Sequence, residues 1–129
     1  MTGTKYYAEF VGTFMLVFIG AAAVLSQQAT ANLGVVGVAL AHGIALMAIV
    51  YAFGRVSGAH VNPAVTLGFW ASKKMGAGEA LRYIASQLLG AVFAAFLLFL
   101  VFPGAEATHL GVTELSVGVN FWQGAALEA

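Results

Sequence analysis

The sequence predicts an all-α membrane protein with three membrane-spanning helices, one re-entrant half-helix and the start of a fourth span. The first observation behind this class is composition: 61% of the 129 residues are hydrophobic and 8% are charged, whereas globular proteins carry about 25% charged residues. The second is that the apolar residues form long stretches separated by short polar ones. The third is an Asn-Pro pair at positions 62 and 63, between two of these stretches. Such a chain needs the lipid bilayer as its solvent, so we expect an integral, multi-pass protein.

Three apolar stretches are each close to the ~20 residues that a helix needs to cross a bilayer. They cover 8–25, 33–53 and 80–101, and a polar loop of residues 26–32 separates the first two. We interpret the first stretch as a retained span and not as a signal peptide, because it is long and follows a single lysine. Small residues four positions apart allow helices to approach closely in lipid. They occur as Ala8 with Gly12, Gly54 with Gly58, and Gly90 with Ala94.

A half-helix is predicted over 62–71. Asn62 is a good N-cap, because its side-chain oxygen can accept a hydrogen bond from an otherwise unpaired N–H, and Pro63 at the first helical position has no N–H to satisfy. Only about ten residues precede the polar Ser72, roughly half of what a span requires, so the helix enters the membrane without crossing it. Gly58-Ala59-His60-Val61 must then be irregular backbone at membrane depth, which is tolerated only inside protein or along a water-filled cavity. This indicates a pore; the alternative is a surface turn before a short amphipathic helix.

Three of the polar side chains within the predicted spans are of particular interest: Glu9, His42 and Gln87. Such groups are costly in lipid and usually face protein or water. For Glu9 we expect a buried acceptor that holds N–H groups of the re-entrant loop, with an interfacial glutamate as the alternative. His42 is either a pore-facing group or a packing residue that donates to a neighbouring carbonyl. Gln87 is the polar residue in the interior of the third span.

The distribution of cationic residues predicts the orientation of the chain. If the chain crosses three times, every lysine and arginine lies on one face, which the positive-inside rule makes cytoplasmic, together with the N-terminus. These residues are Lys5, Arg55, Lys73, Lys74 and Arg82. We expect the segment 102–120, with Glu106, His109 and Glu114, on the outer face. The formal net charge of zero and the lack of a basic block give no indication of a nucleic-acid partner.

Three parts of the sequence resemble the N-terminal half of the aquaporin or major intrinsic protein family. They are Ala8-Glu9-Phe10-Val11-Gly12-Thr13-Phe14, then Ser57-Gly58-Ala59-His60-Val61-Asn62-Pro63-Ala64-Val65-Thr66, and Gln87 with Gly90. The resemblance implies an aquaporin-like fold of which this chain is the first repeat only, within a homotetramer in the cell membrane. It also implies a passive channel for water, and for small neutral solutes such as glycerol, ammonia or urea, that excludes protons and ions.

The resemblance further implies roles for single residues. Asn62 would donate its amide hydrogens to a passing water molecule, and the positive ends of two opposed half-helices would repel cations. His42 stands where family members carry a residue of the narrow filter, and a histidine there is similar to plant vacuolar members that also pass ammonia or urea. The pore and filter residues implied are Asn62, Pro63, Ala64 and His42, with the carbonyls of Gly58, Ala59 and His60. Glu9 and Gln87 would give structural support.

Family channels contain a second repeat with another Asn-Pro-Ala followed by arginine, and this chain carries neither. We therefore expect an incomplete pore that needs a second half, with residues 121–129 as the start of a fourth span. An ion-coupled secondary transporter stays open, because broken helices and inverted repeats are typical of those as well. So does a non-conducting fragment that only assembles with intact subunits. A metal site or membrane enzyme built from His42, His60 and His109 is disfavoured by their separation in sequence, so no metal, cofactor or catalytic residue is predicted.

Overall fold

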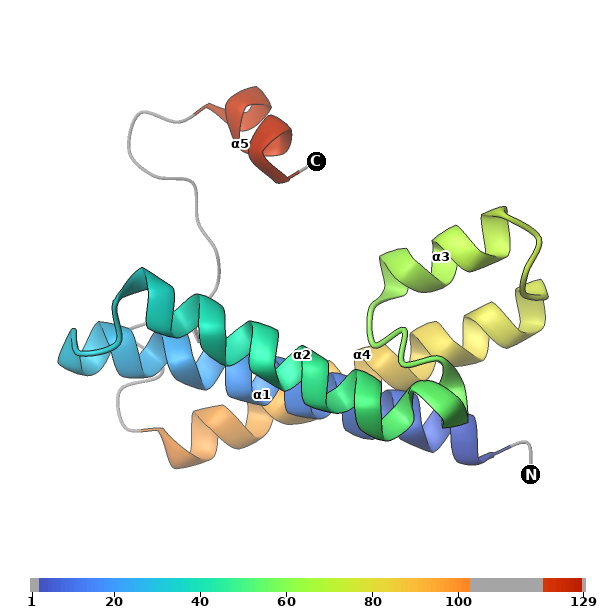
Figure 1. The fold of residues 1–129 in the computed structure, drawn as a ribbon, viewed down its shortest axis with the longest axis horizontal. Helices are drawn as coiled ribbons and strands as arrows, with labels where there is room; N and C mark the ends of the chain where they lie inside the picture. The colour runs from blue at the N-terminus through green and yellow to red at the C-terminus, as the bar shows by residue number, and fades with distance from the viewer. Residues whose placement is uncertain (1–2, 103–119, 129) are drawn as a thin grey trace.

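A computed structural model describes residues 3–102 and 120–128. All regular secondary structure in this part of the chain is helical (Figure 1). The helices are α1 (Thr4–Thr30), α2 (Gly34–Ser57), α3 (Pro63–Ala71), α4 (Ala77–Val101) and α5 (Phe121–Glu128). Helices α1, α2 and α4 are long and apolar enough to cross a membrane, and α3 is much shorter. The predicted all-α membrane fold with three spans and a half-helix is confirmed.

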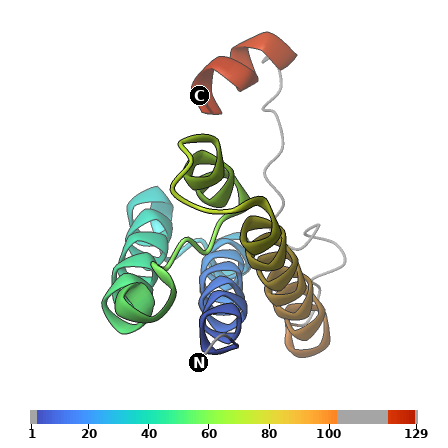
Figure 2. The same ribbon diagram turned by 90° about the vertical axis from the view of Figure 1, so that its right-hand side faces the viewer.

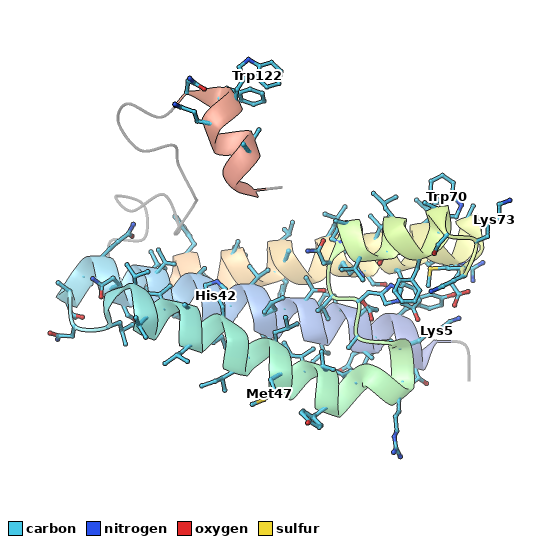
Figure 3. All side chains as sticks on the ribbon, turned by 45° about the horizontal axis from the view of Figure 1, so that its top comes forward. Lys5, His42, Met47, Trp70, Lys73 and Trp122 are labelled. Atoms are coloured by element: carbon cyan, nitrogen blue, oxygen red, sulfur yellow. The ribbon has the colours of Figure 1, made fainter. Side chains whose placement is uncertain are left out.

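The three long helices form a bundle with α1 in the middle. α1 packs against α2 on one side and against α4 on the other, and the end-on view shows the three helices side by side (Figure 2). The half-helix α3 packs against α4. It lies at the end of the bundle where the N-terminus is found (Figure 1). Lys5 and Lys73 lie near this same end (Figure 3).

The long helices extend beyond the apolar stretches that predict them. The predicted loop at 26–32 is wrong in extent, because α1 continues to Thr30. Hydropathy marks the part of a helix that lipid can surround, whereas glutamine and alanine readily continue the helix into a polar setting. α1 ends where Ala31 adopts a left-handed conformation and its N–H donates to Gln27 O at 2.8 Å. The Gln27 side chain then accepts a hydrogen bond from Gly34 N at 2.6 Å, which closes the turn into α2.

Glycine allows α1 and α4 to approach each other closely. Gly90 is buried, and a Cβ atom built on it would overlap the Phe10 carbonyl and lie 3.1 Å from Phe14 N, so it faces α1 backbone. Ala94, one turn further along α4, is fully buried. The spacing of Gly90 and Ala94 thus marks a true contact between two helices. The pair Gly54 and Gly58 does not mark such a contact. A Cβ built on Gly54 would meet no atom of the described residues within 4 Å, and Gly58 is the left-handed cap that ends α2.

A short helix, α5, begins after residues that the structure does not describe. Its first turn is closed by a reciprocal pair, in which Asn120 Oδ1 accepts from Gln123 N and Gln123 Oε1 accepts from Asn120 N, each at 2.9 Å. This is the capping-box arrangement at a helix N-terminus. Among the described residues α5 packs against no other helix. The predicted outer-loop residues Glu106, His109 and Glu114 lie outside the described part of the chain.

We expect Gly90→Ala to destabilise the bundle by about 1–3 kcal/mol, because the added methyl group meets α1 backbone that no side-chain rotation can move. The matched control is Gly78→Ala on the same helix, where a Cβ meets only the end of Arg82 at 4.0 Å. That control should be neutral or slightly stabilising, since alanine favours helix over glycine. Unfolding of the three chains in detergent micelles, followed by circular dichroism, compares them. Equal stability of the two variants would contradict this packing of α1 on α4.

Candidate functional site

The segment between α2 and α3 runs through an unusual backbone conformation. Gly58, Ala59 and Val61 all have positive φ angles, at 89°, 48° and 40°. Glycine adopts this region freely, but for alanine and even more for the β-branched valine it is strained. Ala59, His60 and Val61 are nevertheless buried. A buried, strained backbone persists only where its surroundings fix it, so the contacts of this loop carry the explanation.

A single buried carboxylate holds the loop. Glu9 of α1 is completely buried, and its Oε1 accepts from Ser57 Oγ at 2.6 Å and from His60 N at 3.0 Å. Its Oε2 accepts from Val61 N at 2.7 Å. Ala59 N donates to Ser57 Oγ at 3.1 Å, so three successive N–H groups are satisfied at this one place. Glu9 is thus a buried acceptor for N–H groups of this loop.

The direction of these N–H groups determines the direction of the carbonyl groups. In a trans peptide the C=O of one residue and the N–H of the next point in opposite directions, and no cis peptide occurs among the described residues. The N–H groups of residues 59–61 point toward Ser57 and Glu9. The carbonyl oxygens of Gly58, Ala59 and His60 must therefore point away from Glu9. Within the described part of the chain no donor reaches these three oxygens.

Gln87 of α4 connects Glu9 to the half-helix. Its Nε2 donates to Glu9 Oε2 at 2.7 Å and to Thr66 Oγ1 at 2.9 Å, so both amide hydrogens are used. Thr66 is fully buried on α3. Gln87 Oε1 has no partner in the described structure. If the amide group were turned the other way, Gln87 Oε1 would face the Glu9 carboxylate and two acceptor oxygens would repel each other. The observed amide orientation is therefore favoured.

Tyr83 and His60 complete the support, and the sequence pattern did not identify the tyrosine. Tyr83 is buried and donates its hydroxyl to Ser57 O at 2.9 Å, which satisfies the last carbonyl of α2. The buried His60 ring packs between Phe69 and Tyr83, and its Nδ1 shares a hydrogen bond of 3.1 Å with Thr66 Oγ1. Tyr83 lies four residues before Gln87, on the same face of α4, and this spacing was the available signal.

The half-helix begins as its sequence predicts. Asn62 is the N-cap in extended conformation, and its Oδ1 accepts from Ala64 N at 2.8 Å. Pro63 occupies the first helical position. Because the cap fixes Oδ1, the Nδ2 group must face away from the Ala64 N–H. Asn62 and Ala64 are both exposed in this chain, in contrast to the buried loop before them. The positive end of the α3 dipole thus lies at an accessible surface.

His42 lies apart from this cluster, on the half of α2 that is further from α3 (Figure 3). Its Nδ1 is 3.0 Å from Val38 O, one turn earlier on the same helix. The structure therefore brings Glu9, His60 and Gln87 together around the loop that precedes Asn62, and leaves His42 separate. In residues 3–102 and 120–128 no three His, Asp or Glu side chains gather as metal ligands would. His109 lies outside those residues.

Comparison with known families identifies this arrangement. The family described as major intrinsic protein matches residues 2–129, which include the spans, the loop and the half-helix. The chain belongs to the major intrinsic protein family. The chain spans about half the length of the curated relatives it matches.

Similar family members come from distant organisms. Aquaporin AqpM of Methanothermobacter thermautotrophicus is 42% identical over 137 residues, covering 90% of this chain and 55% of the relative. Aquaporin Z of Photorhabdus laumondii is 39% identical over 130 residues, covering 97% of this chain and 56% of the relative. Glycerol uptake facilitator protein-like 6 of Lactiplantibacillus plantarum is 43% identical over 112 residues, covering 85% of this chain and 50% of the relative. The similarity thus extends to relatives named as aquaporins and to one named as a glycerol uptake facilitator-like protein.

We expect Glu9→Gln to destabilise the chain by about 2–3 kcal/mol, because an amide group replaces one acceptor oxygen and leaves a buried N–H or hydroxyl unpaired. The hydrogen exchange of the His60 and Val61 amides should also become faster. The control is Glu79→Gln, which removes a partly exposed ion pair with Lys5 and should cost much less, because exposed ion pairs contribute little to stability. If Glu9→Gln leaves amide exchange unchanged at both positions, the carboxylate does not hold the loop.

Proposed function

We propose that this chain forms the first repeat of a passive channel for water and for small neutral solutes such as glycerol, ammonia and urea, and that the channel excludes protons and ions. Asn62 carries this proposal. It caps a half-helix with its side-chain oxygen, which leaves the Nδ2 group free to donate at an accessible helix end. An accessible amide donor on the positive end of a half-helix suits a neutral molecule with a hydrogen-bond acceptor, and disfavours a cation.

The loop supplies the complementary acceptors in this mechanism. The carbonyl oxygens of Gly58, Ala59 and His60 point away from Glu9, and a water molecule moving along them exchanges one hydrogen bond for the next. At Asn62 the water oxygen accepts from the amide, so its hydrogens turn away from the positive helix end. This orientation interrupts a continuous chain of hydrogen bonds and so opposes proton transfer. No residue performs covalent chemistry in such a passage.

The complete channel needs a second repeat, which would contribute an opposed half-helix and further filter residues. We propose that this chain pairs with such a repeat, and that four complete channels form a homotetramer. We also propose a cytoplasmic N-terminus in the cell membrane, because Lys5 and Lys73 lie near one end of the bundle and cationic ends favour the cytoplasmic side. His42 would line the narrow filter on the other half of α2, where its ring would limit the size of solutes other than water.

Proteoliposomes that contain this chain together with its second repeat test the function. We expect rapid osmotic water flow in stopped-flow light scattering, entry of urea or glycerol down a gradient, and no conduction of protons. Proteoliposomes with this chain alone are the control and should show much slower flow. Solute uptake that depends on a proton gradient would contradict the passive mechanism and favour the transporter instead.

Asn62→Asp should lower the water permeability of the complete channel several-fold and admit cations. Aspartate can still cap α3, so the helix should persist. Its carboxylate, however, removes the amide donor and places a negative charge on the positive helix end. Water flow and sodium flux in proteoliposomes give the measurement, and circular dichroism shows whether the helices are retained. Unchanged water flow together with unchanged cation exclusion would place Asn62 outside the passage.

His42→Phe should narrow the solute range while water flow is retained, because the larger phenylalanine ring leaves less room for solutes wider than water. The uptake rates of urea and glycerol relative to water, measured by stopped flow, test this expectation. Met47→Phe is the control, since Met47 is exposed and points away from the other helices on the outer side of α2 (Figure 3). Undiminished uptake of the larger solutes by His42→Phe would exclude His42 from the filter.

A further inference from the structure

Gly20 of α1 lies directly against the imidazole ring of His42. A Cβ atom built on Gly20 would overlap His42 Nε2 and would lie 2.7 Å from Cδ2 and 3.0 Å from Cε1. The separations from Nε2 and Cδ2 are too short for any real side chain. While the ring keeps its position, residue 20 must be glycine. The contact differs in kind from that of Gly90, because all three nearest atoms here belong to one side chain and none to backbone.

The opposite edge of the same ring is held by α2. Nδ1 lies 3.0 Å from Val38 O, and since a carbonyl only accepts, Nδ1 must carry the hydrogen. In the neutral ring Nε2 is then the acceptor nitrogen. Nε2 is also the ring atom nearest to the place that a Gly20 side chain would fill. The ring is thus drawn back onto α1, with its acceptor nitrogen directed at the Gly20 backbone.

We propose that Gly20 is a positioning residue. It leaves room for the His42 ring to pack against α1, a contact called here the seat of His42, and thereby sets the width and polarity of the passage at the level of the filter. This inference deepens the proposed function and rests on it. With the ring seated, His42 occupies little of the passage and its Nε2 faces α1. A side chain at position 20 would push the ring off α1, toward the passage, and expose Nε2. Gly20 would therefore favour entry of neutral solutes wider than water, such as urea and glycerol.

A double-mutant cycle on this chain tests whether Gly20 seats the His42 ring against α1. It measures stability and does not require a conducting channel. The variants are Gly20→Ala, His42→Ala and the two together, with Gly43→Ala as the control because its Cβ meets nothing within 4 Å. We expect Gly20→Ala to lower the thermal unfolding midpoint in micelles when His42 is present, and to have little effect or raise it when residue 42 is alanine. If Gly20→Ala fails to fold alone but folds with His42→Ala, the seat is supported. An equal loss in both backgrounds would overturn it.

The exposure of Nε2 gives a second measurement on the same material. Diethylpyrocarbonate acylates the unprotonated nitrogen of an imidazole, and peptide mass spectrometry resolves His42 from the other histidines. We expect Gly20→Ala to accelerate the modification of His42 several-fold, whereas Gly43→Ala should leave the rate unchanged. An unchanged rate in Gly20→Ala would show that glycine does not hold the ring back.

The effect on selectivity is measured in proteoliposomes of the complete channel. Gly20→Ala should reduce urea and glycerol uptake more than water flow, and Gly43→Ala should change neither ratio. Suppose that the double-mutant cycle supports the seat of His42 but Gly20→Ala leaves the ratio of solute uptake to water flow unchanged. That result would overturn the proposed role of Gly20 in selectivity. If the complete channel conducts nothing, the proposed function fails while the result of the cycle still stands, so the two failures are distinguishable.

Discussion

The buried carboxylate of Glu9 is the interaction on which the rest of this structure depends. Irregular backbone at membrane depth cannot hydrogen-bond to lipid, so its N–H groups need an acceptor within the protein. Glu9 accepts from two of them and, through Ser57, orders the third. Because each trans peptide then directs a carbonyl the opposite way, one side chain of α1 satisfies the donors of the loop and at the same time orients a row of acceptors.

The loop is strained, and two features offset that strain. A non-glycine residue held in a sparsely populated region costs of order 1–3 kcal/mol, and Ala59 and Val61 are both left-handed. Hydrogen bonds to a charged group contribute about 1.5–3 kcal/mol each. The hydrogen bonds to Glu9 are therefore strong enough to offset the backbone strain of the loop. The second feature is packing, because Val61 is buried against Ile49 and Gly12. A Cβ on Gly12 would lie 2.6 Å from Val61 Cγ1, so this glycine makes room for the strained valine.

Local chemistry was readable from the sequence, and contacts between distant positions were not. The start of α3 was predictable because Asn62 and Pro63 determine it within a few residues. The end of α1 was not, because hydropathy does not distinguish a polar helical turn from a loop. The cost of burying a charge indicated what Glu9 needs, but nothing in the sequence pairs it with Gln87, 78 positions away. The contact of Gly20 with His42 could likewise not be predicted from the sequence, since a Cβ built on many other glycines of this chain would meet no side chain.

Asparagine is the cap residue that suits a half-helix of this kind. Serine, threonine and aspartate can also accept the hydrogen bond of the first turn, yet only asparagine combines that acceptor with an NH₂ donor at the tip of the same side chain. Pro63 removes one unpaired N–H and Ala64 N is taken by Asn62 Oδ1, so the helix end keeps its positive dipole while few backbone donors remain there. A molecule that reaches this end meets the Asn62 amide. In the proposed channel, the residue that starts the helix would therefore also be the residue best placed to select what passes it.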